Sequence, residues 1–278
     1  MKNKRVKIFK ILILMIPLLL IVVIMSAIFL KNDNIEKIAD ARENEKKADI
    51  TATTDSRFTY TVNSDGTSIT LTKYIGTDTD VIIPSTIDGY TVTSFAQQLL
   101  WNTNFGNAEN IVIPSTVISL YGVDSYTWGS NGGKVKNITV DDNNEYYSSI
   151  DGVLFNKDKT KIIRYPSGKT DNIYYIPNTV TNIESNAFYA CSHLIDIKIP
   201  SSVTSIGKGT FEYCESLTSI EIPSSVTSIG DGTFRYCESL VSIEIPSSVT
   251  SIGNNAFNDC KSLTSIEIPS SVTSIENS

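Results

Sequence analysis

The sequence predicts a mainly β solenoid, in which the chain winds through repeated coils that stack on one another. An Ile-Pro step returns every 23 residues in the C-terminal part of the chain, at Ile176, Ile199, Ile222, Ile245 and Ile268. Apolar and polar residues alternate before each step, as in "LTSIEIP", which is typical of a strand. The apolar content of 41% over 278 residues is enough for a buried core. Together these observations indicate a repeat fold built on β-structure.

The repeat keeps apolar residues in fixed columns. These columns are Leu194, Leu217, Leu240 and Leu263; Ile197, Ile220, Ile243 and Ile266; Val180, Val203, Val226, Val249 and Val272; and Phe188, Phe211, Phe234 and Phe257. A period of roughly 20–29 residues is typical of a leucine-rich-repeat solenoid. The columns should point inward, because a coil stacks best on a neighbour that presents the same residue at the same place. We therefore predict regular 23-residue leucine-rich repeats over residues 177–278.

Each repeat is predicted to contain three parts. "LTSIEIP" reads as a strand that the proline ends, because proline has no N–H to donate to a ladder. "VTSI" reads as a second short extended segment. "GTFRYC" is expected to form a short helical or 3₁₀ turn that returns the chain to the next strand.

The pattern is looser before residue 177. Residues 84–176 hold irregular coils, marked by Ile113-Pro114 and by "VKNITV". Inside them, "YYSSIDGVLFNKDKTKIIRYP" places two apolar strands about a polar turn at Asn156 to Lys159, which predicts an inserted β-hairpin. Residues 57–83 contain "FTYTVNSDGTSITLTKY", which alternates around Asp65-Gly66 and predicts a second hairpin that caps the first coil.

The N-terminus predicts a separate transmembrane helix. Residues 1–10 form a basic tail expected in the cytoplasm, and twenty uncharged residues follow over 11–30, about the length that spans a bilayer. We interpret this run as an uncleaved signal-anchor, with a cleaved signal peptide and a secreted protein as the alternative. Residues 31–56 carry alternating charges and are predicted to be a stalk. In both cases the repeats lie outside the cytoplasm, and in the first case a single-pass cell membrane protein results.

The charge distribution argues against a nucleic-acid partner. The net charge of the chain is −7, but residues 51–278 carry 24 Asp and Glu against 13 Lys and Arg. Binding to a phosphate backbone needs a basic face that displaces counterions. We therefore expect no nucleic-acid partner.

The repeats and the segments before them resemble the BspA-like leucine-rich-repeat proteins, surface proteins of bacteria and some protists with a Treponema-type 23-residue repeat. The resemblance rests on "SLTSIEIPSSVTSIGDGTF" with a Cys three residues after the Phe, on "VIIPSTIDGYTVTSF", and on "ITVDDNNEYYSSIDGVLFNKDKTKIIRYPSGKT", and it covers about residues 57–278. It implies a right-handed solenoid with a parallel sheet on the concave face, display at the cell surface, and a role in adhesion or binding of host proteins. The resemblance assigns no ligand-binding residues, because the residues of the motif are those expected in the core.

The candidate chemical groups are better explained as structure than as catalysis. The cysteine column, Cys191, Cys214, Cys237 and Cys260, has no C-x-x-C pair, and we expect buried free thiols. His193 replaces a serine of the other repeats and is expected in an exposed turn. The glycines of "GKGTF" and "GDGTF" are expected to permit tight turns, and residues 141–144 a turn and not a calcium site. We predict no enzyme, no catalytic residue, no metal site and no cofactor.

The hypothetical binding residues form an outward stripe. Its members are Glu221, Glu244, Glu267, Ser219, Ser242, Ser265 and Lys198. A basic partner would relieve the repulsion between the glutamates, whereas the alternative is a solvated face with no ligand. Trp101 and Trp128, with Tyr121, Tyr126, Tyr146 and Tyr147, are aromatic candidates in the irregular coils.

The repeats, the N-terminal segment and the resemblance lead to a functional hypothesis of membrane-anchored recognition of a protein or surface-glycan ligand, a basic one in particular, with cell-surface adhesion as the expected role. The alternative is a structural spacer or cell-envelope protein without a tight ligand, which includes a truncated form of a longer repeat protein. The last coil ends with "SSVTSIENS" and lacks the polar cap that solenoids usually carry. Self-association through this coil is therefore a further expectation.

Overall fold

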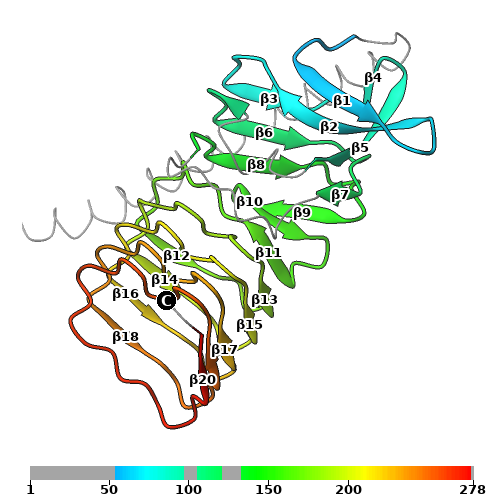
Figure 1. Ribbon diagram of the computed structural model, residues 1–278. Helices are drawn as coiled ribbons and strands as arrows, with labels where there is room; N and C mark the ends of the chain where they lie inside the picture. Colours follow the sequence, from blue (N-terminus) through cyan, green and yellow to red (C-terminus); the bar gives the residue numbers. More distant parts are fainter. Residues whose placement is uncertain (1–53, 97–104, 121–132, 277–278) are drawn as a thin grey trace, which may run out of the picture. The chain divides into compact units, whose positions relative to one another are not determined.

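The computed structural model describes residues 54–96, 105–120 and 133–276 (Figure 1). The chain divides into two units, Met1–Thr53 and Thr54–Ser278, and the description below concerns the second. The predicted basic tail, the transmembrane segment at 11–30 and nearly all of the predicted stalk lie outside the described residues. Within the ranges given above, no helix has the length and apolar character needed to cross a bilayer.

Two parallel sheets, one three-stranded and one four-stranded, are formed by the strands that precede the Ile-Pro steps and by the strand that ends at Val140. The first contains β3 (Asp80–Ile82), β6 (Asn110–Ile113) and β8 (Asn137–Val140). The second contains β12 (Ile173–Tyr175), β14 (Asp196–Lys198), β16 (Ser219–Glu221) and β18 (Ser242–Glu244). Residues one period apart are register partners, such as Ile220 and Ile243, which confirms the predicted parallel strands.

The "VTSI" segments also form parallel strands, in two sheets. In the regular repeats, β13 (Asn182–Ile183) pairs with β15 (Ser205–Ile206) in one sheet, and β17 (Ser228–Ile229), β19 (Ser251–Ile252) and β20 (Ser274–Ile275) pair in the other. The partners are again 23 residues apart, as between Ile229 and Ile252. The prediction of a second extended segment is therefore confirmed.

The "GTFRYC" segments are turns, and the prediction of helical or 3₁₀ turns is wrong for the described repeats. Gly209 and Tyr213 both adopt left-handed backbone conformations, with φ of 59° and 61°. A right-handed helix cannot continue through such residues. Alternate N–H groups instead bond the next coil, from Gly209 to Asp231 O at 2.8 Å and from Tyr213 to Arg235 O at 2.9 Å. The turns thus form a third set of hydrogen bonds between coils.

The N-terminal hairpin is present as predicted. Strands β1 (Phe58–Val62) and β2 (Ser68–Tyr74) pair in antiparallel fashion. β2 then pairs in parallel with β5 (Tyr90–Phe95), which also contacts β4 (Thr86–Ile87) and β7 (Ser119–Leu120). The hairpin is therefore joined to the first coil by backbone hydrogen bonds.

The inserted hairpin has one more strand than the sequence predicted. β10 (Val153–Asn156) pairs with β11 (Lys161–Arg164) as expected, but also with β9 (Tyr147–Ile150), and both pairings are antiparallel. β11 continues in parallel into β13. Both faces of β10 are buried: Val153 and Phe155 belong to the core of the regular repeats, and Leu154 to the core of the N-terminal coils. The insertion therefore forms the wall between two hydrophobic cores.

Arg164 completes the transition from this hairpin to the regular repeats. In the repeats, a turn N–H donates to the carbonyl 22 residues later, as from Phe188 to Thr210. The buried Arg164 side chain donates from Nη2 to Tyr189 O at 3.2 Å and from Nη1 to Asn186 O at 2.7 Å. Arg164 thus supplies hydrogen-bond donors that a repeat turn of the "GTFRYC" type supplies in the regular coils.

The cysteine column is buried and unpaired, as predicted. All four cysteines are free thiols inside the core. They do more than fill space, since Cys214 Sγ donates to Phe188 O at 3.2 Å and Cys237 Sγ to Phe211 O at 3.1 Å. Each of these thiols bonds the preceding coil at a carbonyl of the phenylalanine column. Burial raises the pKa of Cys260 to about 11 and that of Cys191 to about 12.

Candidate functional site

The outward side chains of β12, β14, β16 and β18, here called the sheet face, include the predicted acidic stripe. Glu221 and Glu244 are exposed register partners on adjacent strands, beside the pair Ser219 and Ser242. Strands in a sheet lie about 4.8 Å apart. Two carboxylates at such a spacing in water repel by roughly 1 kcal/mol or less, a cost that the fold tolerates and that a cation would remove.

The acidic stripe is shorter than predicted. Ser265 and Glu267 lie within residues 263–269, which form no strand, so they do not extend the ladder beyond β18. In this coil the column residues Leu263 and Ile266 are only partly buried. The weaker core packing leaves less to hold this segment against β18.

Lys198 lies on the sheet face but is already paired. Its Nζ atom is 2.6 Å from the Asp196 carboxylate, on the same side of β14. The hydrogen bond to Asp196 raises the pKa of Lys198, and the charge of Glu221 adds to the effect. Sequence reasoning missed Asp196, although its position two residues before Lys198 predicts the same face.

An apolar patch at the β12 end of the sheet face was also missed. The side chain of Tyr175 is 68% exposed and that of Ile173 is 47% exposed. Tyr175 is the register partner of Lys198, and Ile173 that of Asp196. The 23-residue spacing was the signal that could have found them. The sheet face therefore runs from an aromatic and apolar end to an acidic end.

The aromatic candidates of the irregular coils divide into two groups. Trp101, Trp128, Tyr121 and Tyr126 lie outside the described residues. Tyr146 is 49% exposed. Tyr147 is half-buried and its hydroxyl accepts a hydrogen bond from the Leu120 N–H at 3.1 Å. Tyr147 therefore packs against the preceding coil, and burial raises its pKa.

The Asp-Asn segment at residues 141–144 forms a turn, as the sequence predicts. Asn144 is fully buried and donates to the carbonyls of Pro114 and Val117 at 3.0 and 2.9 Å. Its side-chain oxygen accepts from the N–H groups of Tyr146 and Tyr147. Within the described ranges, no three His, Cys, Asp or Glu side chains lie together in a way that could hold a metal ion.

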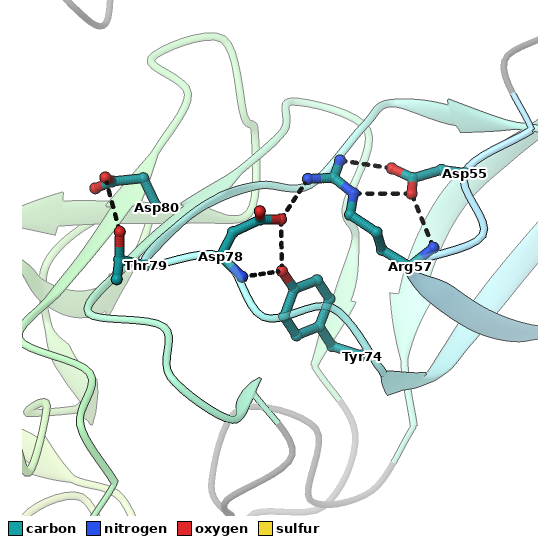
Figure 2. Close-up of polar contacts among 6 residues, drawn as sticks. All are labelled: Asp55, Arg57, Tyr74, Asp78, Thr79 and Asp80. Carbon is teal, nitrogen blue, oxygen red and sulfur yellow. Dashed lines mark hydrogen bonds and ion pairs between the residues drawn. The ribbon is translucent and has the colours of Figure 1, made fainter.

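A polar cluster beside the N-terminal hairpin is satisfied by its own members (Figure 2). Arg57 bridges Asp55 and Asp78 with contacts of 2.7 and 2.8 Å. The Tyr74 hydroxyl donates to Asp78 at 2.8 Å and accepts from its N–H at 3.2 Å. The hydrogen bonds from Arg57 lower the pKa of both Asp55 and Asp78. These contacts connect the residues just before β1 with those after β2.

The turns carry a second surface that sequence reasoning missed, here called the turn face: Tyr189, Glu212, Tyr213, Arg235 and Tyr236. The rings of Tyr213 and Tyr236 stack with centroids 4.5 Å apart and planes at 14°. Tyr189 meets Tyr213 edge-on at 5.4 Å. The Arg235 guanidinium lies 5.3 Å from the centre of the Tyr236 ring. The recurring "YC" before the Glu-Ser pair was the available signal.

Arg235 is held in place by a nearly buried carboxylate. Glu212 is 6% exposed and accepts hydrogen bonds from Nε and Nη2 of Arg235, the first at 2.8 Å. Burial raises the pKa of Glu212, while Arg235 opposes that effect. Glycines leave room for the carboxylate, since a Cβ at Gly209 would lie 3.1 Å and one at Gly232 3.4 Å from Glu212 Oε2.

The two stacked tyrosines are in unfavourable backbone conformations. Tyr213 and Tyr236 have φ of 61° and 60°, a region where glycine, Asn and Asp are favoured. The strain is roughly 1–2 kcal/mol for each residue. The stacked and edge-on pairs return about 0.5–1.5 kcal/mol each. The strain and the ring contacts are similar in size and opposite in sign. The ring contacts therefore give little net stability, and stability alone does not account for tyrosine at these positions.

The stacked 23-residue coils with their parallel ladders define a leucine-rich-repeat β-solenoid. Residues 169–278 match the family described as BspA type Leucine rich repeat region in six copies. The resemblance inferred from the sequence is thereby confirmed over these residues.

Three solved structures are similar to this chain. The pneumococcal vaccine antigen PcpA is 29% identical, with a TM-score of 0.56 over 62% of this chain and 42% of that chain. A leucine rich cell surface protein from Faecalibacterium prausnitzii is 24% identical over 82% and 95% of the two chains, with a TM-score of 0.48. The T. pallidum leucine rich repeat protein is 26% identical over 81% and 86%, with a TM-score of 0.39. This chain therefore spans less than half of the pneumococcal chain. No curated protein matched the sequence.

Proposed function

We propose that this chain is a non-enzymatic recognition protein displayed outside the cytoplasm, and that its sheet face binds a partner protein. The observation that carries the proposal is the juxtaposition on one face of an exposed apolar end, at Ile173 and Tyr175, with an acidic end at Glu221 and Glu244. Exposed aromatic side chains supply much of the energy of protein interfaces, and complementary charges set the register of the partner.

The chemistry of the sheet face selects a basic partner segment with an apolar anchor. Among the described residues, the carboxylates of Glu221 and Glu244 form no ion pair, whereas Lys198 is paired with Asp196. A Lys or Arg side chain over the stripe would therefore remove repulsion without breaking an existing pair. The acidic character of residues 51–278 would also attract a basic partner over a longer range.

Membrane anchoring and adhesion are the finer parts of the proposal. The twenty uncharged residues at 11–30 after five cations support an anchor. The BspA-type repeats support recognition at a surface. A protein tethered in this way would present its repeats outside the cytoplasm.

The test is binding of the full chain to immobilised basic extracellular-matrix proteins at low and high salt. The variant Glu221→Gln/Glu244→Gln should weaken binding about three- to tenfold at low salt, with less effect at high salt. Tyr175→Ala should weaken binding about tenfold or more at both salt concentrations.

A matched control removes two exposed carboxylates from the inserted segment, as Glu145→Gln/Asp158→Asn, and should bind like the unaltered chain. Equal losses in both double variants would show that overall charge acts instead of the sheet face. Absence of binding to every protein tested would refute the proposal and favour the structural spacer.

A further inference from the structure

The turn face offers a group of side chains that neither the repeat lattice nor the sheet face explains. The two left-handed positions in each turn recur with the repeat. The first position holds Asn186, Gly209, Gly232 and Asn255, which the backbone favours. The second position holds Ala190, Tyr213, Tyr236 and Asp259. Tyrosine at two successive second positions is contrary to backbone preference, and side chains kept against such strain are often functional.

The ring stack ends at Tyr236. The next coil places Asp259 where another ring would continue the stack, and Asn258 beside it, and both are exposed. The backbone of this coil is directly adjacent, because the Tyr236 N–H donates to Asn258 O at 2.9 Å. The end of the stack thus combines one half-buried aromatic ring with a carboxylate and an amide.

Arg235 adds hydrogen-bond donors at a fixed position. A guanidinium has five N–H donors, and Glu212 accepts from Nε and Nη2 of Arg235. The side chain remains 36% exposed although its partner carboxylate is nearly buried. The ion pair therefore orients donors beside the Tyr236 ring with little loss of side-chain freedom on binding.

The charges around this ring disfavour an anionic ligand. Arg235 is neutralised by Glu212, and Lys261 is paired with Glu238 at 2.5 Å. Asp259 adds a further negative charge, and this charge acts on Lys261 as that of Glu238 does. A ligand with an apolar face and neutral hydroxyl groups fits better than a carboxylate or phosphate.

We infer that the turn face is a saccharide-binding site for a neutral sugar of a surface glycan. The C–H face of a pyranose packs on the Tyr236 ring, while its hydroxyl groups accept from Arg235 and donate to Asp259. Stacked aromatic rings with adjacent polar groups provide both the apolar and the polar part of such a contact. This inference deepens the proposed recognition function and rests on it, but it assigns glycan and protein binding to different surfaces.

The test uses the full chain and saturation-transfer NMR with neutral oligosaccharides of glucose, galactose, mannose and N-acetylhexosamine as probes. The informative variant is Tyr236→Asn, because Asn is favoured at φ of 60° and the fold should be retained while the ring is lost. Binding should fall about tenfold or more in Tyr236→Asn. It should change less than about threefold in Tyr236→Phe, which keeps the ring.

The controls separate this inference from the proposed function. Thermal unfolding should show Tyr236→Asn at least as stable as the unaltered chain, and Glu221→Gln/Glu244→Gln should bind saccharides normally. Failure of every probe to bind, or equal saccharide binding by Tyr236→Asn, would overturn the inference and leave the sheet face untouched. Loss of protein binding instead of saccharide binding in Tyr236→Asn would also overturn it, since the turn face would then be a protein contact.

Discussion

Two glycines that look equivalent in the sequence should respond differently to the same substitution. Gly207 and Gly230 both follow "VTSI", and neither has a left-handed backbone. A Cβ at Gly207 would lie 2.4 Å from Ser185 N and 2.8 Å from the Glu184 carbonyl carbon. A Cβ at Gly230 would lie 3.3 Å from Lys208 Cα, which needs only a small adjustment. The stacking of coils is thus tight at one glycine and looser at the other.

The expected loss for Gly207→Ala follows from three contributions. Crowding against backbone atoms costs about 1–3 kcal/mol. The Gly207 N–H bond to Ile183 O, at 2.8 Å, would be weakened, at roughly 1 kcal/mol. Reduced freedom of the unfolded chain returns about 0.4–1 kcal/mol. We expect a net loss of about 2 kcal/mol in the free energy of unfolding, and a change within about 1 kcal/mol of zero for Gly230→Ala.

The assay is thermal unfolding of the two variants followed by circular dichroism. A loss of about 2 kcal/mol corresponds to a fall in midpoint of roughly 4–8 °C for a folded part of this size. Gly230→Ala is the matched control, with the same residue change at the same place in the repeat. Equal midpoints for the two variants would refute the reasoning, because they would show that the coils adjust their spacing freely.

Three other predictions concern buried groups. The folded chain should resist thiol reagents near pH 8, because burial raises the pKa of Cys191 to about 12 and of Cys260 to about 11. The folded state therefore holds protons that the unfolded state releases, and stability should fall as the pH rises from about 9 toward these values; rapid labelling without unfolding would contradict this. Arg164→Ala should cost about 3 kcal/mol in urea unfolding, because it removes the guanidinium donors to the buried carbonyls of Asn186 and Tyr189, whereas a loss within about 0.5 kcal/mol would show that the remaining donors, the Tyr189 N–H and the Cys191 thiol, are sufficient. Asn144→Ala and Asn144→Asp should each cost about 2–4 kcal/mol in the same assay, since neither can donate to the two carbonyls that Asn144 binds; calcium restoring the Asp variant would instead indicate a metal site.

Much of the fold could be predicted from the sequence because the repeat lattice acts on every coil alike. Leu217, Ile220 and Phe211 must match the residues one period away, so their columns predict the inward face, the strands and the burial of the thiols. The two hairpins could be predicted from local turn signals at Asp65-Gly66 and Asn156 to Lys159. These features depend on residues that lie close in the sequence or one period apart.

Features that depend on local departures from the lattice could not be predicted. Glu267 has the same sequence neighbours as Glu244 but lies outside the strand ladder, in a coil where Leu263 and Ile266 are only partly buried. Arg164 reads as an ordinary charged residue on a hairpin, yet it is buried where two different backbone patterns meet. Strand β9 was missed because its residues are half-buried and carry little alternation.

The candidate surfaces show the same division. The alternation in "LTSIEIP" was enough to predict that Glu221 and Glu244 point outward from neighbouring strands. The sequence by itself therefore determined the solenoid, its inward columns and the direction of the sheet face, because a 23-residue period fixes which residues are neighbours. Only the tertiary structure decided that Tyr213 and Tyr236 are strained, that their rings stack and that Arg235 is fixed by a buried carboxylate. Backbone conformation and ring contacts arise when coils meet in three dimensions, and a one-dimensional pattern does not contain them.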